Sequence, residues 1–253
     1  MRHTLKLIVL FLSFLLLSDI QPALSFQLLP ISRTFSPTGS GSTQSYQVIN
    51  DTQEKLAVEV SIVERQIDIA GQESHKQAAD DFLIYPPQIL LNPGESQTVR
   101  VTWLGEPKPS KELAYRLIAE QLPINLGKPQ DNQSQPVGAV KLLMRYLGSI
   151  YIRPTNVKQN VVLETVEPLQ GKNDEKQLAI TLHNQGTAHA VLKNLHLQLS
   201  AAGQKLMVNL KGEQLAAMNN AVILSGNKRR FIIPHPPELP TSAVTATLDF
   251  SRN

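Results

Sequence analysis

The 253-residue sequence contains no cysteine, and aromatic residues make up only 5% of it. Without cysteine the chain cannot hold a disulfide framework, a thiolate metal site, a cysteine nucleophile or the lipid of a lipoprotein. Its 24 basic and 21 acidic residues nearly balance, so it lacks the concentrated basic face of a nucleic-acid binder. Hydrophobic residues make up 42%, which is enough to bury a core and excludes a disordered chain.

The sequence also lacks the motifs of common enzymes. It has no glycine-rich phosphate loop and no Gly-x-Ser-x-Gly turn. Four histidines of the C-terminal half have no acidic residue at the spacing of a zinc or catalytic site: His183, His189, His196 and His235. We therefore expect no enzymatic activity, no metal and no cofactor. The single tryptophan, Trp103, does not favour the aromatic platform of a carbohydrate-binding module.

The first 25 residues predict a secretory signal peptide. Arg2 and Lys6 make a basic start, and the apolar run 7–17 is too short to span a bilayer as a mature helix. The small-x-small pattern at 23–25 places the mature N-terminus at Phe26, and an uncleaved membrane anchor is the alternative. No later apolar run approaches about 18 residues, so we expect an exported mature chain without membrane insertion.

The remaining chain predicts an all-β fold. Short runs of Val, Ile, Leu, Thr and Tyr are separated by clusters of Pro, Gly, Asn and Asp. Apolar and polar residues alternate over 56–62 and 98–103, and the second run follows an Asn-Pro-Gly turn at 92–94. No segment keeps a helical period over ten residues. This spacing favours antiparallel sandwiches of about 100 residues each.

A domain boundary is predicted near Arg153-Pro154-Thr155, where a long β-type run ends and the strand pattern restarts. Residues 26–153 and 154–253 then each have the size of an immunoglobulin-like sandwich. The polar stretch 127–136 predicts a mobile loop that leads into the run Val137 to Ile152.

The run from Val137 to Ile152 is long for a strand and carries an apolar row on one face: Val140, Leu142, Met144 and Tyr146. It is either an ordinary interior strand or an edge strand that offers this row to a partner. Periodicity alone does not decide between the two.

Several short segments of the sequence occur together in an order that is typical of one protein family. They are RTFSPTG at 33–39, YPPQILLNPG at 85–94, TVRV at 98–101, Glu112 with Tyr115, LPI at 122–124, YIRP at 151–154, LHNQGTAH at 182–189 and GNKRRFIIP at 226–234. With these segments the chain resembles the PapD-like family of periplasmic pilus-assembly chaperones. The last two are similar to its alternative, or archaic, branch.

The resemblance implies two immunoglobulin-like sandwiches in an L-shaped arrangement and a periplasmic, non-enzymatic chaperone. Such a chaperone binds pilus or fimbrial subunits by donor-strand complementation and delivers them to an outer-membrane usher. The implied donor row is Val140, Leu142 and Met144, with Tyr146 at its near end. The exposed row also allows weak self-association of the free protein. A secreted two-domain adhesin or structural surface subunit is the alternative.

The resemblance further implies an anchor for the C-terminal carboxylate of the subunit. Arg33 matches the family's anchoring arginine, and a surface arginine that caps a turn is the alternative. The family's lysine partner falls at Ser149, so one cation is missing. Arg100 is the candidate replacement because it lies on the polar face of its strand, although a solvated strand face is equally compatible.

Glu112 and Arg153 match positions of an interdomain salt bridge in the family, and an exposed pair of little energetic worth is the alternative. The Pro86-Pro87 pair is a candidate for a cis peptide bond, because X-Pro is the only common site for one, with trans the commoner state.

Overall fold

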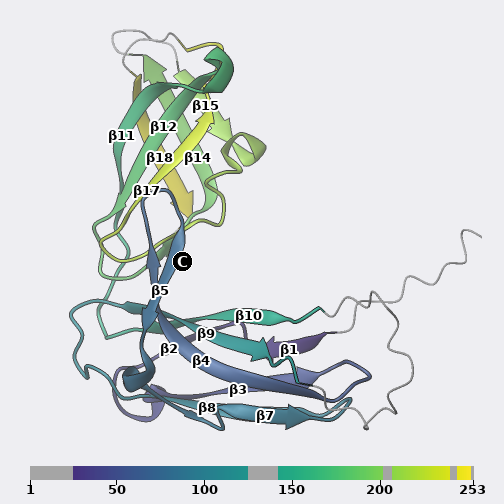
Figure 1. Cartoon of the computed structure of the whole chain (residues 1–253). Coiled ribbons are helices and arrows are strands. Elements are labelled where there is room, and N and C mark those ends of the chain that lie inside the picture. The colour runs from purple at the N-terminus through teal and green to yellow at the C-terminus, as the bar shows by residue number, and fades with distance from the viewer. Residues whose placement is uncertain (1–24, 125–141, 202–206, 240–243, 252–253) are drawn as a thin grey trace, which may run out of the picture.

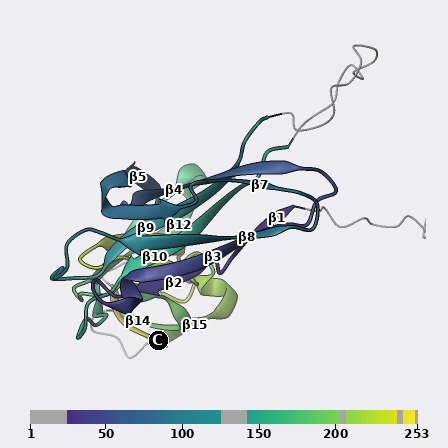
Figure 2. The same ribbon diagram turned by 90° about the horizontal axis from the view of Figure 1, so that it is seen from below.

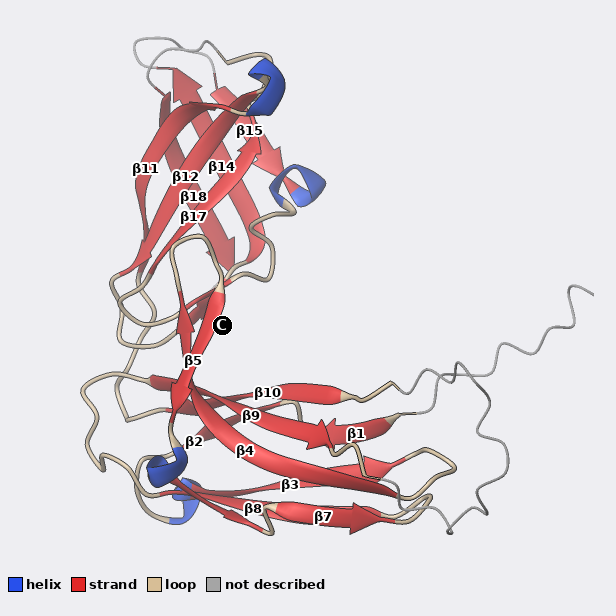
Figure 3. Ribbon diagram, viewed as in Figure 1, coloured by secondary structure: helices blue, strands red, loops and turns tan. Residues whose placement is uncertain are grey.

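The computed structural model describes residues 25–124, 142–201, 207–239 and 244–251. Nearly all regular structure is β-strand, and it forms two sandwiches that together have the shape of an L (Figures 1 and 3). The predicted all-β fold with two immunoglobulin-like sandwiches is thereby confirmed. The predicted signal peptide lies outside the described residues, apart from Ser25. None of the helices in the described ranges is long and apolar enough to cross a membrane.

The N-terminal sandwich consists of two sheets. The first has the strand order β1-β3-β8-β6, with bounds Phe26–Leu29, Thr43–Asn50, Ser96–Trp103 and Phe82–Tyr85. The second has the order β2-β10-β9-β4-β5, with bounds Ser32–Phe35, Arg145–Ile152, Leu113–Gln121, Leu56–Ile67 and Glu73–Gln77, and β7 (Gln88–Leu91) also pairs with β4. Seen from below, β3 and β8 lie in front and the C-terminal sandwich behind (Figure 2).

The core of this sandwich follows from the alternation of its strands. On β8 the side chains of Val99 and Val101 are fully buried, while Arg100 between them is exposed. A cluster of edge-to-face aromatic rings closes one end of the core, with Phe82 at 5.0 Å from both Trp103 and Tyr115. The predicted alternation between a buried face and a solvent-exposed face is therefore confirmed for this strand.

The C-terminal sandwich contains the remaining strands. One sheet has the order β11-β12-β17, with bounds Val161–Gln170, Lys176–Asn184 and Lys228–Pro234. Another has the order β15-β14-β18, with bounds Met207–Lys211, Lys193–Ala201 and Val244–Ser251, and β13 (Ala190–Val191) pairs with β16 (Val222–Ile223). The short 3-10 helices are η1 (Ser40–Ser42), η2 (Ala79–Asp81), η3 (Lys172–Asp174) and η4 (Gly212–Leu215).

The hairpin of β4 and β5 extends from the N-terminal sandwich to β17 of the C-terminal one (Figure 1). Its turn places Gly71 at φ +93°, and a Cβ there would collide with the guanidinium of Arg229, so glycine suits both the backbone and the contact. The carbonyl of Ile69 accepts a hydrogen bond from the amide of Arg230 at 2.7 Å. The hairpin tip thus covers part of the outer edge of β17.

Each sandwich has a buried asparagine at the end of a strand. The side-chain amide of Asn50, which ends β3, donates to three carbonyls, those of Glu54, Leu91 and Asn92. Asn184, which ends β12, donates to the carbonyls of Ala188, Ile223 and Leu224, and its Oδ1 accepts from the amides of Asn160 and Gly186. These side chains satisfy backbone groups at strand ends and in the connections next to them.

We expect Asn184→Ala to lower the free energy of unfolding of the C-terminal sandwich by about 3 kcal/mol, because several buried backbone groups lose their partner at once. Urea denaturation followed by circular dichroism measures this change. Asn209→Ala, at an exposed position of β15, is the matched control and should change stability by no more than about 0.5 kcal/mol. Equal effects of the two substitutions would contradict the role of Asn184.

Candidate partner-binding edge and interdomain cleft

Strand β10 has a complete neighbour on one side only. β9 pairs with all 8 residues of β10, whereas β2 pairs in parallel only with residues 149–152. On this outer side the amide of Ser149 also donates to the carbonyl of Ile31 at 2.8 Å. Since alternate residues direct their backbone groups to opposite sides, Arg145 and Leu147 point theirs away from β9. Within the described ranges no strand pairs with residues 145–148 on that side, and we call this stretch the open edge of β10.

The residues before the open edge differ from the sequence prediction. One strand was expected from Val137 to Ile152, but β10 begins at Arg145 and residues 142–144 lie outside any strand. The reason is that β9 ends at Gln121, whose amide donates to the carbonyl of Met144 at 2.9 Å, so β9 offers no residue for pairing further along. Leu142 is 78% exposed and Met144 39% exposed. Val140 lies outside the described residues.

Tyr146, at the near end of the predicted donor row, packs against its own domain. Its ring meets Phe26 edge-to-face at 4.8 Å, and its hydroxyl lies 3.2 Å from the Ser25 hydroxyl. Because Tyr146 shares the inward face of β10 with Ile150 and Ile152, it fills the end of the core. Leu142 and Met144 are therefore the described members of the row that are exposed in the free chain.

Arg33 lies on β2 opposite Ile150 of β10. Its guanidinium donates to Oε1 of Gln44 at 3.3 Å and to the carbonyl of Ser45 at 3.1 Å. Its buried Nε has no acceptor, and no carboxylate pairs with it, among the residues that the structure describes. Burial raises the pKa of Tyr46 while the charge of Arg33 opposes that rise, which places this cation beside the core. Arg33 is thus oriented by neutral groups only and keeps a free positive charge.

The cation next to Ser149 is Arg116 rather than Arg100. Arg116 on β9 stands directly opposite Ser149, and its Nη1 donates to the Ser149 hydroxyl at 2.6 Å. Arg100 lies in the other sheet, opposite Ser45 of β3, with its side chain exposed. Sequence reasoning missed Arg116 because the register between β9 and β10 brings it to Ser149, and no local motif encodes that register.

Glu73 on β5 holds Arg116 in place. One of its carboxylate oxygens accepts from Nε of Arg116 at 2.6 Å and the other from Nη2 at 2.7 Å, while Nε of Arg65 donates at 2.8 Å. Nε2 of His75 lies 2.9 Å from the same carboxylate. Partial burial would raise the pKa of Glu73, but the hydrogen bonds from Arg116 and His75 and the nearby guanidinium charges lower it to about 2. We call these side chains, with Ser149, the Glu73 cluster.

Glu112 joins the two sandwiches. It precedes β9 and is only 5% exposed, and Nε of Arg153 donates to its carboxylate at 2.5 Å. From the C-terminal sandwich, the amide of His189 donates to the other carboxylate oxygen at 3.0 Å and its Nδ1 lies 2.5 Å away. The His189 ring also stacks on Tyr151 at 3.8 Å. The predicted contact of Glu112 with Arg153 is present, and His189 supplies the bond across the domains that sequence reasoning missed.

Hydrogen bonds determine the ionisation of Glu112. Burial alone would raise its pKa, but the bonds from His189 and Arg153 outweigh this effect and hold the pKa below the ordinary value of 4.5. A small apolar cluster of Ile67, Tyr151 and Leu224 packs nearby across the same junction. The junction therefore combines one buried charge with a small dry contact.

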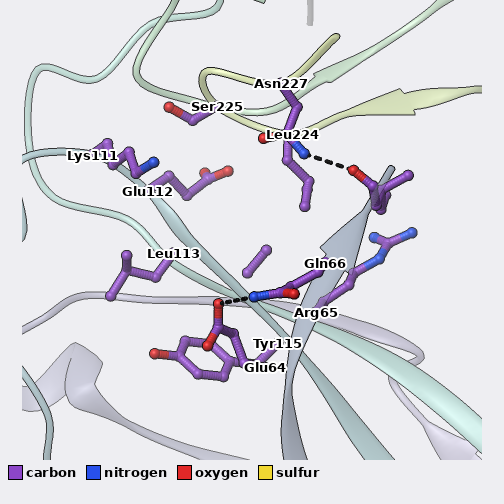
Figure 4. A pocket seen from close by; sticks show the side chains of 12 residues that line it. Glu64, Arg65, Gln66, Lys111, Glu112, Leu113, Tyr115, Leu224, Ser225 and Asn227 are labelled. Carbon is purple, nitrogen blue, oxygen red and sulfur yellow. Dashed lines mark hydrogen bonds between the residues drawn. The ribbon is translucent and has the colours of Figure 1, made fainter. Parts of the chain in front are cut away.

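A polar cavity of about 370 Å³ lies beside this junction (Figure 4). Side chains of β4, the start of β9 and the 224–227 loop line it, among them Gln66, Lys111, Glu112 and Asn227. Asn227 connects the two sandwiches, since its side-chain amide donates to the carbonyl of Ile67 at 2.9 Å. In the described residues no group of three acidic or histidine side chains could hold a metal ion.

We expect Glu112→Gln to lower the free energy of unfolding at pH 7 by about 2 kcal/mol, because charge-assisted bonds to a buried carboxylate are lost. The folded pKa of Glu112 is depressed, so its stabilisation is present above about pH 4.5 and is lost as the pH falls through the folded value. Thermal unfolding between pH 7 and pH 3 should therefore depend less on pH in Glu112→Gln than in the parent. Glu167→Gln, from an exposed pair with Arg230, is the control. Parallel pH curves for parent and Glu112→Gln would contradict the prediction.

Solved structures of chaperones and of their complexes share this fold. The class 5 fimbriae chaperone CfaA is 18% identical, with a TM-score of 0.53, over 90% of this chain and 100% of CfaA. A chain in the CsuC-CsuE chaperone-tip adhesion subunit pre-assembly complex, from archaic chaperone-usher Csu pili of Acinetobacter baumannii, is 16% identical, with a TM-score of 0.59, over 88% of this chain and 97% of that chain. A chain in the Salmonella enterica SafA pilin complex with the SafB chaperone is 15% identical, with a TM-score of 0.50, over 85% and 86% of the two chains.

No curated protein matches this chain in sequence. Residues 34–158, however, match the family model of the PapD N-terminal domain, described as pili and flagellar-assembly chaperone. This match covers most of the N-terminal sandwich, including Glu112, Arg116 and the open edge of β10. Through this domain the chain belongs to the PapD-like family of pilus assembly chaperones.

Proposed function

We propose that the protein is a periplasmic chaperone that binds pilus subunits along the open edge of β10 and delivers them to an outer-membrane usher. The observation that carries this proposal is that no strand in the described part of the chain pairs with the outer side of β10 over residues 145–148, directly after exposed apolar side chains. An unpaired edge with an apolar row is a template for a strand of another chain. The proposal includes no enzymatic activity and no cofactor.

The apolar row supplies the binding energy in this proposal. Leu142 and Met144 are exposed in the free protein, and each would contribute about 1.5 to 3 kcal/mol when buried in a groove of the subunit. Backbone pairing with Arg145 and Leu147 adds affinity without demanding one subunit sequence. Val140 extends the row in the proposed complex.

Two cations, one on each of the strands that flank β10, form the proposed carboxylate anchor. Arg33 carries a charge with no acidic partner among the described residues, and Arg116 is fixed at the position where the family's lysine is absent. Guanidinium groups bind a carboxylate through two parallel hydrogen bonds, which suits recognition of a chain end. Arg116 therefore replaces Arg100 as the proposed second cation.

The chain organisation in this proposal is a removed signal peptide of residues 1–25, a chaperone domain of residues 26–153 and a second domain of residues 154–253.

Delivery to an usher requires a surface that stays free while β10 is occupied. Strands β6 and β7 carry three exposed apolar side chains that lie away from that edge: Leu83, Tyr85 and Leu90. In its sheet, β6 is at the opposite end from β1. Weak self-association of the free protein through its open edge also belongs to the proposal.

Co-expression with a pilus subunit in the periplasm tests the donor row. The double variant Leu142→Asp/Met144→Asp should reduce recovery of the subunit at least about tenfold, because charged side chains cannot enter an apolar groove. Met207→Asp, which changes another exposed apolar side chain in the C-terminal sandwich, is the matched control and should leave recovery unchanged. Unchanged recovery with the double variant would refute donation by this segment.

The same assay tests the anchor. Arg33→Ala and Arg116→Ala should each lower the yield of the complex about tenfold, because a charge-assisted bond to the carboxylate is lost. Arg100→Ala should not affect the yield, since its side chain lies on the outer face of the other sheet. Thermal unfolding of each free variant shows whether a lower yield reflects lost binding rather than lost folding. A loss with Arg100→Ala and none with Arg116→Ala would reverse the assignment.

A further inference from the structure

Glu73 pairs with Arg116, and the carboxylate anchor by itself does not need this pairing. Its carboxylate occupies the side of Arg116 formed by Nε and Nη2, at 2.6 and 2.7 Å. This is the paired donor geometry with which a guanidinium binds any carboxylate. The third nitrogen, Nη1, is engaged by Ser149 at 2.6 Å. Every nitrogen of Arg116 thus already has a partner in the free protein.

The arrangement is also enclosed. The side chain of Arg116 is 16% exposed and that of Glu73 is 22% exposed. A second carboxylate that approaches Arg116 would therefore meet the negative charge of Glu73 at close range and in a region where solvent screens it poorly. Small anions in solution are disfavoured at this cation.

We propose that Glu73 is an internal carboxylate ligand that occupies Arg116 in the free chaperone and is displaced from it by the C-terminal carboxylate of a bound subunit. This inference rests on the proposed function, which supplies the incoming carboxylate. The exchange replaces one carboxylate on Arg116 with another. Glu73 keeps Arg65 and His75 as partners after it leaves Arg116, so its charge is not left without a donor.

The exchange gives the site selectivity for a tethered carboxylate. A subunit that already lies along β10 presents its chain end at an effective concentration in the millimolar range or above, whereas a free anion arrives only at its bulk concentration. Glu73 is tethered as well, so only a ligand held by a second contact competes with it well. The open edge and the cation then have to be engaged together, which excludes peptides that satisfy only one of them.

Acetate is a probe that reports on Arg116 without any subunit. The Nε–H resonance of Arg116 is followed by ¹⁵N NMR during titration with sodium acetate. Sodium chloride at equal ionic strength is the salt control. Arg116→Lys assigns the resonance, because the signal is missing from its spectrum. Glu73→Gln should respond to acetate at a concentration about tenfold lower than the parent, because the competing charge is gone. Glu120→Gln, which removes an exposed carboxylate from the same strand, is the matched control and should behave as the parent.

Equal acetate responses in the parent and Glu73→Gln would overturn the proposal, as would a weaker response in Glu73→Gln, which would make Glu73 a group that merely positions Arg116. If Glu73→Gln does not fold, Glu73→Asp gives the same test, because its side chain is one methylene too short to hold both guanidinium groups and should also increase the response. The co-expression assay separates this inference from the proposed function. Unchanged subunit recovery with Leu142→Asp/Met144→Asp, together with the expected acetate response of Glu73→Gln, would refute only the function, and the reverse pair of results would refute only the role of Glu73.

Discussion

The buried carboxylate of Glu112 is the constraint on which the arrangement of the two sandwiches depends. A charge that is 5% exposed must be satisfied by donors, and here the donors come from both domains, Arg153 at the end of the first and His189 in the second. Removing either domain's contribution would leave a buried charge with too few partners. The β4–β5 hairpin also connects the two sandwiches, because the backbone at its tip bonds to that of Arg230. The second strand of this hairpin carries Glu73. One hairpin therefore carries both a contact between the sandwiches and the carboxylate that pairs with Arg116.

Charge compensation separates the cations around the cleft into two kinds. Arg116 and Arg153 each pair with a carboxylate that is itself partly or fully buried. Arg33 is oriented by an amide and a carbonyl, and none of the described acidic residues pairs with it. In the proposed anchor these two kinds of cation allow stepwise recognition: the uncompensated charge of Arg33 would attract a chain end, and Arg116 would bind it only after Glu73 is displaced. In this proposal Ser149, at the position of the family's lysine, leaves the second cation to Arg116, which is already paired with Glu73.

The sequence predicted those features that depend on local alternation and turns. Val99 and Val101 are buried and Arg100 is exposed, as the period of two requires. Features that depend on strand order were not visible. Arg116 meets Ser149 only through the register of β9 and β10, and His189 meets Glu112 only because two domains touch. The predicted strand from Val137 was too long for a related reason: alternation describes which faces a segment can present, but a strand also needs a neighbour, and β9 ends at Gln121.

The edges of the sheets show why β10 in particular is suited to binding another chain. β17 has its outer edge partly covered by the hairpin tip through Ile69, and β5 presents mostly exposed polar side chains. The edge strands β1, β2 and β6 are only four residues long. Short, covered or polar edges are the usual protection against unwanted pairing. Among the described residues no segment covers β10 over residues 145–148, and exposed apolar side chains precede this stretch at Leu142 and Met144. An uncovered edge next to exposed apolar side chains, in a sandwich whose edge strands β1, β2, β5 and β6 are short or polar, supports the proposal that this surface binds a partner, and the exposed apolar row requires that the partner be able to bury it.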